Sequence, residues 1–206
     1  MIPCPWIRID RYLEMRQFLF WLEVGLLIAA AGTLGYSGYR WAAARAFQRL
    51  AARDLRAASR LAPLTNPSME GSVLGKIEIP RLGVSTVILE GTVDSTLDLG
   101  VGHIPGTALP AQAGNVGLAG HRDTFFRPLR QIAPGDSVLI ATGDRAYWYV
   151  VEETRVVTPE DVYVLEPTAQ DALTLVTCYP FSFIGAAPKR FVVRAIRTET
   201  NLRSEN

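Results

Sequence analysis

The chain has 206 residues, a length that suits one globular domain with appended segments. Its 21 basic and 20 acidic residues leave a net charge of +1. The overall charge therefore gives no electrostatic reason to expect that the protein binds nucleic acid. The only two cysteines, Cys4 and Cys178, exclude a disulfide framework and a zinc site built on paired cysteines.

A long apolar segment follows the first part of the chain. Residues 18–39 carry a single charge, Glu23, and as a helix they extend about 33 Å, enough to cross a bilayer. Aromatic residues near both ends of the segment fit the belts of a membrane helix. We therefore predict a cytoplasmic tail over 1–17 and a transmembrane helix over 18–39. A cleaved signal peptide is the alternative, because the alanine run 42–44 offers small residues for a cleavage site.

The next segment predicts a stalk. Residues 40–61 are rich in alanine, leucine and arginine, which are strong helix formers. From Arg45 onward the arginines recur every three or four residues, so they lie near one stripe of a helix. Two interpretations remain open: a stalk that lies against anionic lipid, or a solvated helical spacer. We place the stalk and a proline-containing linker over 40–71 and a structured domain over 72–206.

Short apolar segments separated by glycine and proline make up the structured domain. We expect strands at 73–79, 84–89, 101–104, 115–121, 138–142, 146–157, 161–165, 173–178 and 190–197. Helical turns are expected at 94–100, where Asp94 is a candidate N-cap, and at 125–132. About eight short strands in a domain of this size suggest a closed barrel or a sandwich.

Cys178 ends one of these apolar segments. Pro180 follows shortly after, and because proline cannot donate to a strand ladder, the strand should end near the cysteine. A thiol at the end of a strand is held rigidly, and the adjoining turn leaves it accessible. A buried cysteine that acts as a small hydrophobic residue is the alternative.

Other candidate groups lie on both sides of Cys178 in the chain. His121, one of only two histidines, ends a glycine-rich segment, so only the fold can bring its imidazole to the thiol. Arg190 begins the strand after the cysteine, where a loop between neighbouring strands would set it beside Cys178. A nearby cation favours the thiolate, an imidazolium can protonate a leaving amine, and a guanidinium can hold a carbonyl or an oxyanion. These groups together suffice for acyl transfer through a thioester.

Three motifs carry a resemblance to a known family. Residues 174–178, TLVTC, match the TLxTC signature of sortases. Residues 118–122, LAGHR, and 189–193, KRFVV, resemble the family's segments with the catalytic histidine and arginine. The resemblance covers residues 74–197, and the run GHIPGT at 102–107 is most similar to the class D branch.

The resemblance implies an all-β fold, a closed eight-stranded sortase-type β-barrel with short helices, preceded by the transmembrane helix and helical stalk. It implies a membrane-anchored cysteine transpeptidase that cleaves a C-terminal sorting signal through a thioester and transfers the acyl group to an amine. Cys178 would be the nucleophile and His121 the general acid. Arg190 would stabilise substrate and oxyanion, and backbone amides near Thr177 and Cys178 would contribute to the oxyanion site.

The implied partners are secreted proteins with an LPxTG-like sorting signal, and an amine acceptor such as a peptidoglycan precursor or a pilin lysine. Neither a cofactor nor a metal is expected. Some sortases bind calcium through acidic residues before the cysteine strand, but Glu160, Asp161 and Glu166 are interpreted as a solvated loop. Arg122 and Asp123 are interpreted as a surface pair.

Charge does not settle the orientation of the chain, because arginines flank both ends of residues 18–39. The resemblance puts the domain 72–206 outside the cytoplasmic membrane of a single-pass protein. The alternative function is a membrane-tethered β-barrel that binds polypeptide without catalysis.

Overall fold

The computed structural model describes residues 7–58, 69–143, 145–183 and 185–198. The chain divides into two compact units, Met1–Arg45 and Ala46–Asn206. Its elements are, in order, α1 (Ile7–Ala58), β1 (Val73–Ile79), η1 (Pro80–Leu82), β2 (Val84–Glu90), α2 (Asp94–Leu97), β3 (Val101–His103), β4 (Asn115–Ala119), η2 (Arg127–Gln131), β5 (Ser137–Thr142), β6 (Arg145–Val157), η3 (Val162–Leu165), β7 (Ala172–Tyr179) and β8 (Lys189–Arg197). The first residues of the predicted tail, Cys4 among them, and most of the predicted linker lie outside the described residues.

α1 is one continuous helix, and the predicted span 18–39 lies inside it. Within its portion Met15–Leu50, an 18-residue window has a mean hydropathy of 1.8, so this portion is long and apolar enough to cross a membrane. Large apolar side chains such as Phe18 and Trp21 are more than half exposed on it. An apolar surface of this length fits a lipid environment, and a signal sequence near an N-terminus also meets this criterion of length and composition.

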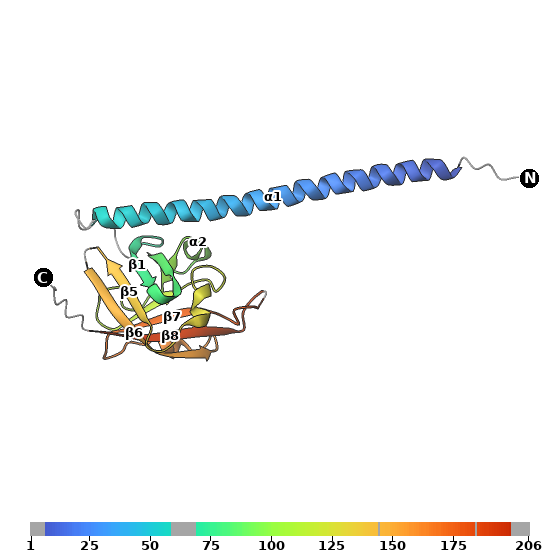
Figure 1. The fold of residues 1–206 in the computed structure, drawn as a ribbon. Coiled ribbons are helices and arrows are strands. Elements are labelled where there is room, and N and C mark those ends of the chain that lie inside the picture. Colours follow the sequence, from blue (N-terminus) through green and yellow to red (C-terminus); the bar gives the residue numbers. More distant parts are fainter. Residues whose placement is uncertain (1–6, 59–68, 144, 184, 199–206) are drawn as a thin grey trace, which may run out of the picture. The chain divides into compact units, whose positions relative to one another are not determined.

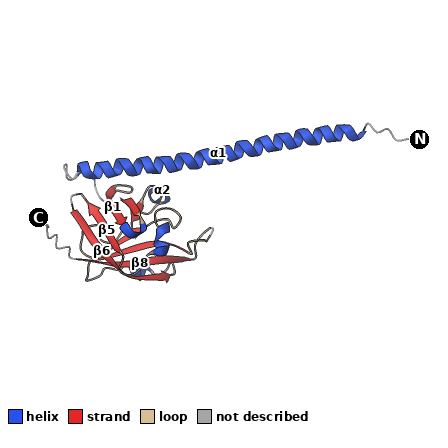
Figure 2. Ribbon diagram, in the orientation of Figure 1, coloured by secondary structure: helices blue, strands red, loops and turns tan. Residues whose placement is uncertain are grey.

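The strands of the second unit close into a barrel in the order β1-β2-β3-β4-β7-β8-β6-β5 (Figures 1 and 2). β1 pairs with both β2 and β5, which closes the ring. β2 with β3 and β4 with β7 are parallel pairs, and the other pairs are antiparallel. The predicted closed eight-stranded barrel is confirmed.

The alternation of side chains along β7 and β8 decides which residues face outward. Leu173 and Leu175 of β7 and Val193 of β8 are fully buried in the barrel core. Because neighbouring residues of a strand point to opposite faces, Cys178 and Arg190 belong to the outer face. The core therefore positions the candidate site by filling the other side of the same strands.

Two sequence-based predictions are wrong in detail. The expected strand at 161–165 is the 3₁₀ helix η3, although its valines and tyrosine favour strands. The barrel is closed, so β6 and β7 already have neighbours on both edges, and no edge is left for another strand. Asp94 does not cap α2: it is the first helical residue, and Val93 occupies the N-cap position without a side-chain hydrogen bond.

His103 lies in a buried hydrogen-bonded network at the end of β3. Its side chain is 2% exposed, and its Nδ1 lies 2.8 Å from a carboxylate oxygen of Glu90. Its Nε2 lies 3.0 Å from the carbonyl oxygen of Ala108. Since that oxygen can only accept, Nε2 carries a hydrogen. His103 thereby ties the ends of β2 and β3 to the loop that leads to β4, which is a structural task.

Candidate active site

Cys178 and Arg190 face each other across neighbouring strands. They are direct partners in the antiparallel pairing of β7 and β8. Cys178 is a half-buried free thiol. Nη1 of Arg190 donates to the carbonyl oxygens of Ala187, at 3.1 Å, and Lys189, at 3.0 Å. Within the described residues Nε and Nη2 make no hydrogen bond, so an anchored guanidinium keeps donors for a ligand beside the thiol.

His121 reaches the same end of the barrel from the other side of β7. β4 runs parallel to β7 with Ala119 opposite Val176, and the amide of Gly120 donates to the carbonyl oxygen of Val176 at 3.1 Å. His121 follows two residues after Ala119, as Cys178 follows two residues after Val176, so both residues lie at the same end of the barrel. The fold thus brings a thiol, an imidazole and a guanidinium to three neighbouring strand ends.

Thr177 connects the two strands that carry the thiol and the imidazole. Its side chain is 2% exposed, and its hydroxyl donates to the carbonyl oxygen of Gly120 at 2.7 Å. The hydroxyl is therefore committed to holding β4 against β7. A contribution of the Thr177 backbone amide to an oxyanion site stays a prediction.

Arg122 links the loop after His121 to the loop after Cys178. Its guanidinium donates to the carbonyl oxygens of Pro180, at 3.2 Å, and Gly185, at 2.8 Å. It also lies 5.9 Å from the ring centroid of Phe183. The sequence-based interpretation of Arg122 as half of a surface pair with Asp123 is replaced by this role as a clamp between two loops.

We expect Arg122→Gln to lower kcat for the peptide cleavage that the sequence resemblance implies by on the order of tenfold to hundredfold, with a smaller change in KM. The reason is that loss of the clamp misplaces His121 relative to Cys178 without removing either group. Steady-state kinetics measure the split, and Arg130→Gln, at an exposed arginine of η2, is the matched control. Unchanged kinetics for Arg122→Gln would show that the clamp does not position the site.

Aromatic side chains support the end of β7. The ring of Phe191 lies 5.3 Å from that of Phe181 and 6.3 Å from that of Tyr179, measured between centroids. Phe181 and Phe191 also pack against the barrel core. Such packing restrains the strand end that carries Cys178.

The loop between β6 and β7 is held over the outer face by Asn115. Its Nδ2 donates to the carbonyl oxygens of Val164 and Glu166, both at 3.1 Å. Its Oδ1 accepts a hydrogen bond of 2.7 Å from the hydroxyl of Thr174. η3 is therefore fixed beside the face that carries Cys178.

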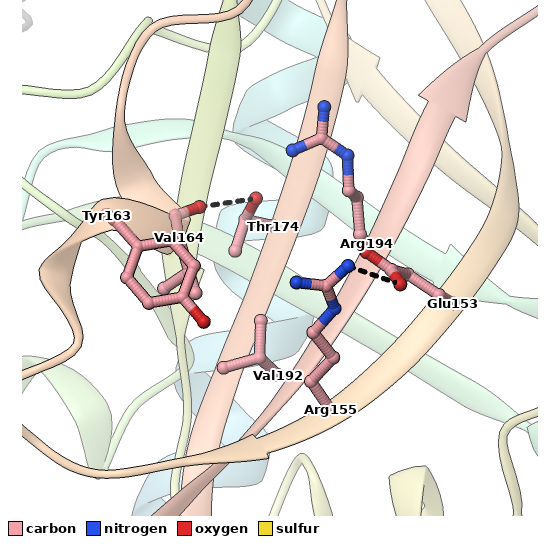
Figure 3. Close-up of a pocket in the computed structure, with 7 residues that line it drawn as sticks. All are labelled: Glu153, Arg155, Tyr163, Val164, Thr174, Val192 and Arg194. Atoms are coloured by element: carbon pink, nitrogen blue, oxygen red, sulfur yellow. Dashed lines mark hydrogen bonds and ion pairs between the residues drawn. The ribbon is translucent and has the colours of Figure 1, made fainter.

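A cavity of about 340 Å³ lies under η3, on the outer face of β6, β7 and β8 (Figure 3). It is lined by Glu153, Arg155, Tyr163, Val164, Thr174, Val192 and Arg194. Arg155 and Glu153 form an ion pair of 2.9 Å, and this hydrogen bond raises the pKa of Arg155 above its ordinary value. Arg155 therefore keeps its positive charge beside Glu153.

No group of three or more histidine, cysteine, aspartate or glutamate side chains gathers within the part of the chain that the structure describes. Asp161, one of the acidic residues considered for calcium, accepts hydrogen bonds from the amide of Thr158, at 2.8 Å, and from its hydroxyl, at 2.9 Å. Its carboxylate is therefore engaged in a turn.

Residues 77–198 match the family model described as the sortase domain. The chain belongs to the sortase family. This match confirms the resemblance that the three sequence motifs indicated.

The chain is 35% identical over 124 residues to Sortase D of Bacillus subtilis, a match covering 60% of this chain and 63% of that protein. It is 37% identical over 129 residues to Sortase SrtE1 of Streptomyces coelicolor, covering 53% of this chain and 37% of that protein. The chain thus spans less than two thirds of the length of these two sortases.

Solved sortase structures share the fold. A Clostridium perfringens Sortase D5 transpeptidase aligns with a TM-score of 0.63 at 26% identity, covering 75% of this chain and 97% of that one. The sortase C of Clostridium perfringens with the C-terminal cell wall sorting motif aligns with a TM-score of 0.60 at 31% identity, covering 65% and 74%.

Proposed function

We propose that the chain is a membrane-anchored cysteine transpeptidase that cleaves the C-terminal sorting signal of secreted proteins and transfers the acyl group to an amine. The observation that carries the proposal is the placement of Cys178 between Arg190 and His121 on neighbouring strand ends. Membership of the sortase family supports the same chemistry.

The first half of the reaction forms a thioester. The Cys178 thiolate attacks the carbonyl carbon of the scissile peptide bond, and the carbonyl oxygen becomes an oxyanion. Nε and Nη2 of Arg190, together with backbone amides near Thr177 and Cys178, stabilise that charge. The C–N bond then breaks as the imidazolium of His121 donates its proton to the leaving amine.

The second half returns the site to its starting state. The incoming amine attacks the thioester carbonyl, and the neutral imidazole of His121 accepts the proton that the amine loses. The C–S bond breaks, and the Cys178 thiolate leaves. The products are a new amide bond and an imidazolium–thiolate pair.

The substrate is a polypeptide with an LPxTG-like sorting signal, and the acceptor is an amine such as a peptidoglycan precursor or a pilin lysine. A related sortase C has been solved with a cell wall sorting motif, which supports this substrate class. The proposed reaction uses no cofactor. The thiol is the nucleophile, the imidazole is the acid, and the guanidinium provides electrostatic stabilisation.

The proposed organisation is a cytoplasmic tail over 1–17, a membrane span over 18–39, a stalk and linker over 40–71, and the catalytic domain over 72–206 outside the cytoplasmic membrane. The apolar length of α1 supports a single span. The orientation rests on the substrate, because secreted proteins meet the site outside the cell.

The proposal is tested with the full chain in detergent micelles and a peptide library built on the LPxTG pattern. Release of a quenched fluorophore measures cleavage, and mass spectrometry measures transfer to an added amine. Hydroxylamine should convert the thioester into a hydroxamate. A folded protein that binds library peptides but cleaves none would instead support the alternative, a polypeptide-binding barrel without catalysis.

We expect Arg190→Lys to slow single-turnover acylation by on the order of a hundredfold or more, since lysine cannot reproduce a planar fork of donors. Arg197→Lys is the matched control, because Arg197 lies at the far end of β8 and pairs with Asp171 at 2.9 Å. Acylation by Arg190→Lys at a near-normal rate would mean that Arg190 supplies only positive potential.

A further inference from the structure

The cavity under η3 lies on the same face of the barrel as the thiol. Cys178 pairs with Arg190, and four residues further along each strand Thr174 pairs with Arg194. Residues separated by an even number along a strand share a face, so both pairs belong to the outer face. The cavity lies about 13 Å from Cys178 along the strand, a span that an extended polypeptide covers in about four or five residues.

Arg194 presents its charge to this cavity. Its side chain is 30% exposed, and its Nε lies 3.5 Å from a carboxylate oxygen of Glu152, which is 58% exposed. An ion pair this long and this solvated is weak. The terminal nitrogens of Arg194 make no hydrogen bond within the residues that the structure describes, and Figure 3 shows them directed away from Glu153. Two parallel donors of a guanidinium match the two oxygens of a carboxylate.

The other groups of the cavity leave that charge uncompensated. Arg155 and Glu153 neutralise each other at 2.9 Å. The hydroxyl of Thr174 donates to other atoms of the protein, Asn115 Oδ1 at 2.7 Å and the Val164 carbonyl at 3.3 Å, so it competes little for a ligand. Val192, 4% exposed, gives the cavity an apolar side that suits methylene groups.

We infer that this cavity is a subsite for the carboxylate of an aspartate or glutamate in the polypeptide substrate, paired with the guanidinium of Arg194. The inference rests on the proposed function for the identity of the substrate. The subsite would make the protein prefer substrates with a negatively charged side chain about four or five residues from the cleaved bond. The occupant is a side chain of the substrate, because the cavity and Cys178 share one face of β7 and β8.

The test measures binding on the full-length Cys178→Ala protein, so that its outcome does not depend on turnover. The probes are fluorescein-labelled peptides with a central Leu-Pro-Ala-Thr-Gly segment. A single glutamate is moved through the flanking positions, five and six residues before the cleaved bond and three to six residues after it. Each glutamate peptide is paired with a glutamine peptide. A peptide with the glutamate at its far end has the same net charge and serves as the control for non-specific attraction.

At one position we expect the glutamate peptide to bind about tenfold more tightly than its glutamine partner, by fluorescence anisotropy. The preference should vanish in Arg194→Gln and should reverse in favour of lysine in Arg194→Glu. It should persist in Arg145→Gln, which removes an exposed arginine at the start of β6.

Equal binding of glutamate and glutamine peptides at every position would overturn the subsite, and so would a preference that survives Arg194→Gln. Cleavage by the unmodified protein is measured in parallel. Cleavage without a glutamate preference contradicts the subsite alone. A glutamate preference without cleavage leaves the subsite standing and contradicts the proposed function.

Discussion

We expect Cys178→Ala to abolish both cleavage and transfer and to leave the barrel folded. The thiolate is the only group at the site that can form the acyl intermediate, whereas the loss of one sulfur from a half-buried position removes little packing. Cleavage is followed by fluorescence, transfer by mass spectrometry and folding by circular dichroism with a thermal melt.

Cys4→Ala is the matched control, since it removes the chain's other thiol and should keep full activity. A folded Cys178→Ala protein that still cleaves a sorting peptide would remove Cys178 from the role of nucleophile. Loss of activity together with loss of the thermal transition would instead assign Cys178 to the packing of β7.

We expect His121→Gln to lower the rate of cleavage by about 10²–10⁴-fold, because glutamine can hydrogen-bond but cannot deliver a proton to the leaving amine. Its thermal midpoint should stay close to that of the unmodified protein, since His121 is only half-buried at the end of β4. The rate is measured as acylation in a single turnover, which separates this step from release of product.

His103→Ala is the contrasting variant. It leaves the buried carboxyl group of Glu90 without its hydrogen-bond partner and so costs about 1–3 kcal/mol of unfolding free energy. Cleavage per folded molecule should fall far less than in His121→Gln, because His103 lies buried among structural hydrogen bonds. An exchange of these two outcomes would show that the histidines had been assigned the wrong way round.

Local sequence patterns identified most of the barrel's strands. The run that becomes β7 is aliphatic and β-branched up to Cys178, and Pro180 marks its end, so its bounds lie within one residue of those predicted. The segment 161–165 has the same local character, yet it forms η3. Strand propensity expresses only how well a residue suits a pleated surface, and a strand also needs an unoccupied edge to pair with.

The candidate site was recognised by residue type and spacing, but its neighbours were not. The sequence suggests that Arg122 forms a surface pair with Asp123, because nothing in it indicates that its partners are backbone carbonyls of another loop. Asn115 was passed over for the same reason: it holds η3 through carbonyl oxygens far away in the chain. Backbone partners leave no side-chain pattern that a sequence could display.

The sequence by itself determined the apolar helix, the strand-rich domain and the residue types for acyl transfer, because these depend on composition, local periodicity and short motifs. Only the tertiary structure decided the register that makes Arg190 the direct pairing partner of Cys178, and the parallel pairing of β4 with β7 that brings His121 to the same end of the barrel. It alone showed that Arg194 lines a cavity formed with β6, β7 and η3. Register and closure of a barrel are set by contacts between distant segments, and such contacts are determined only when the whole core packs.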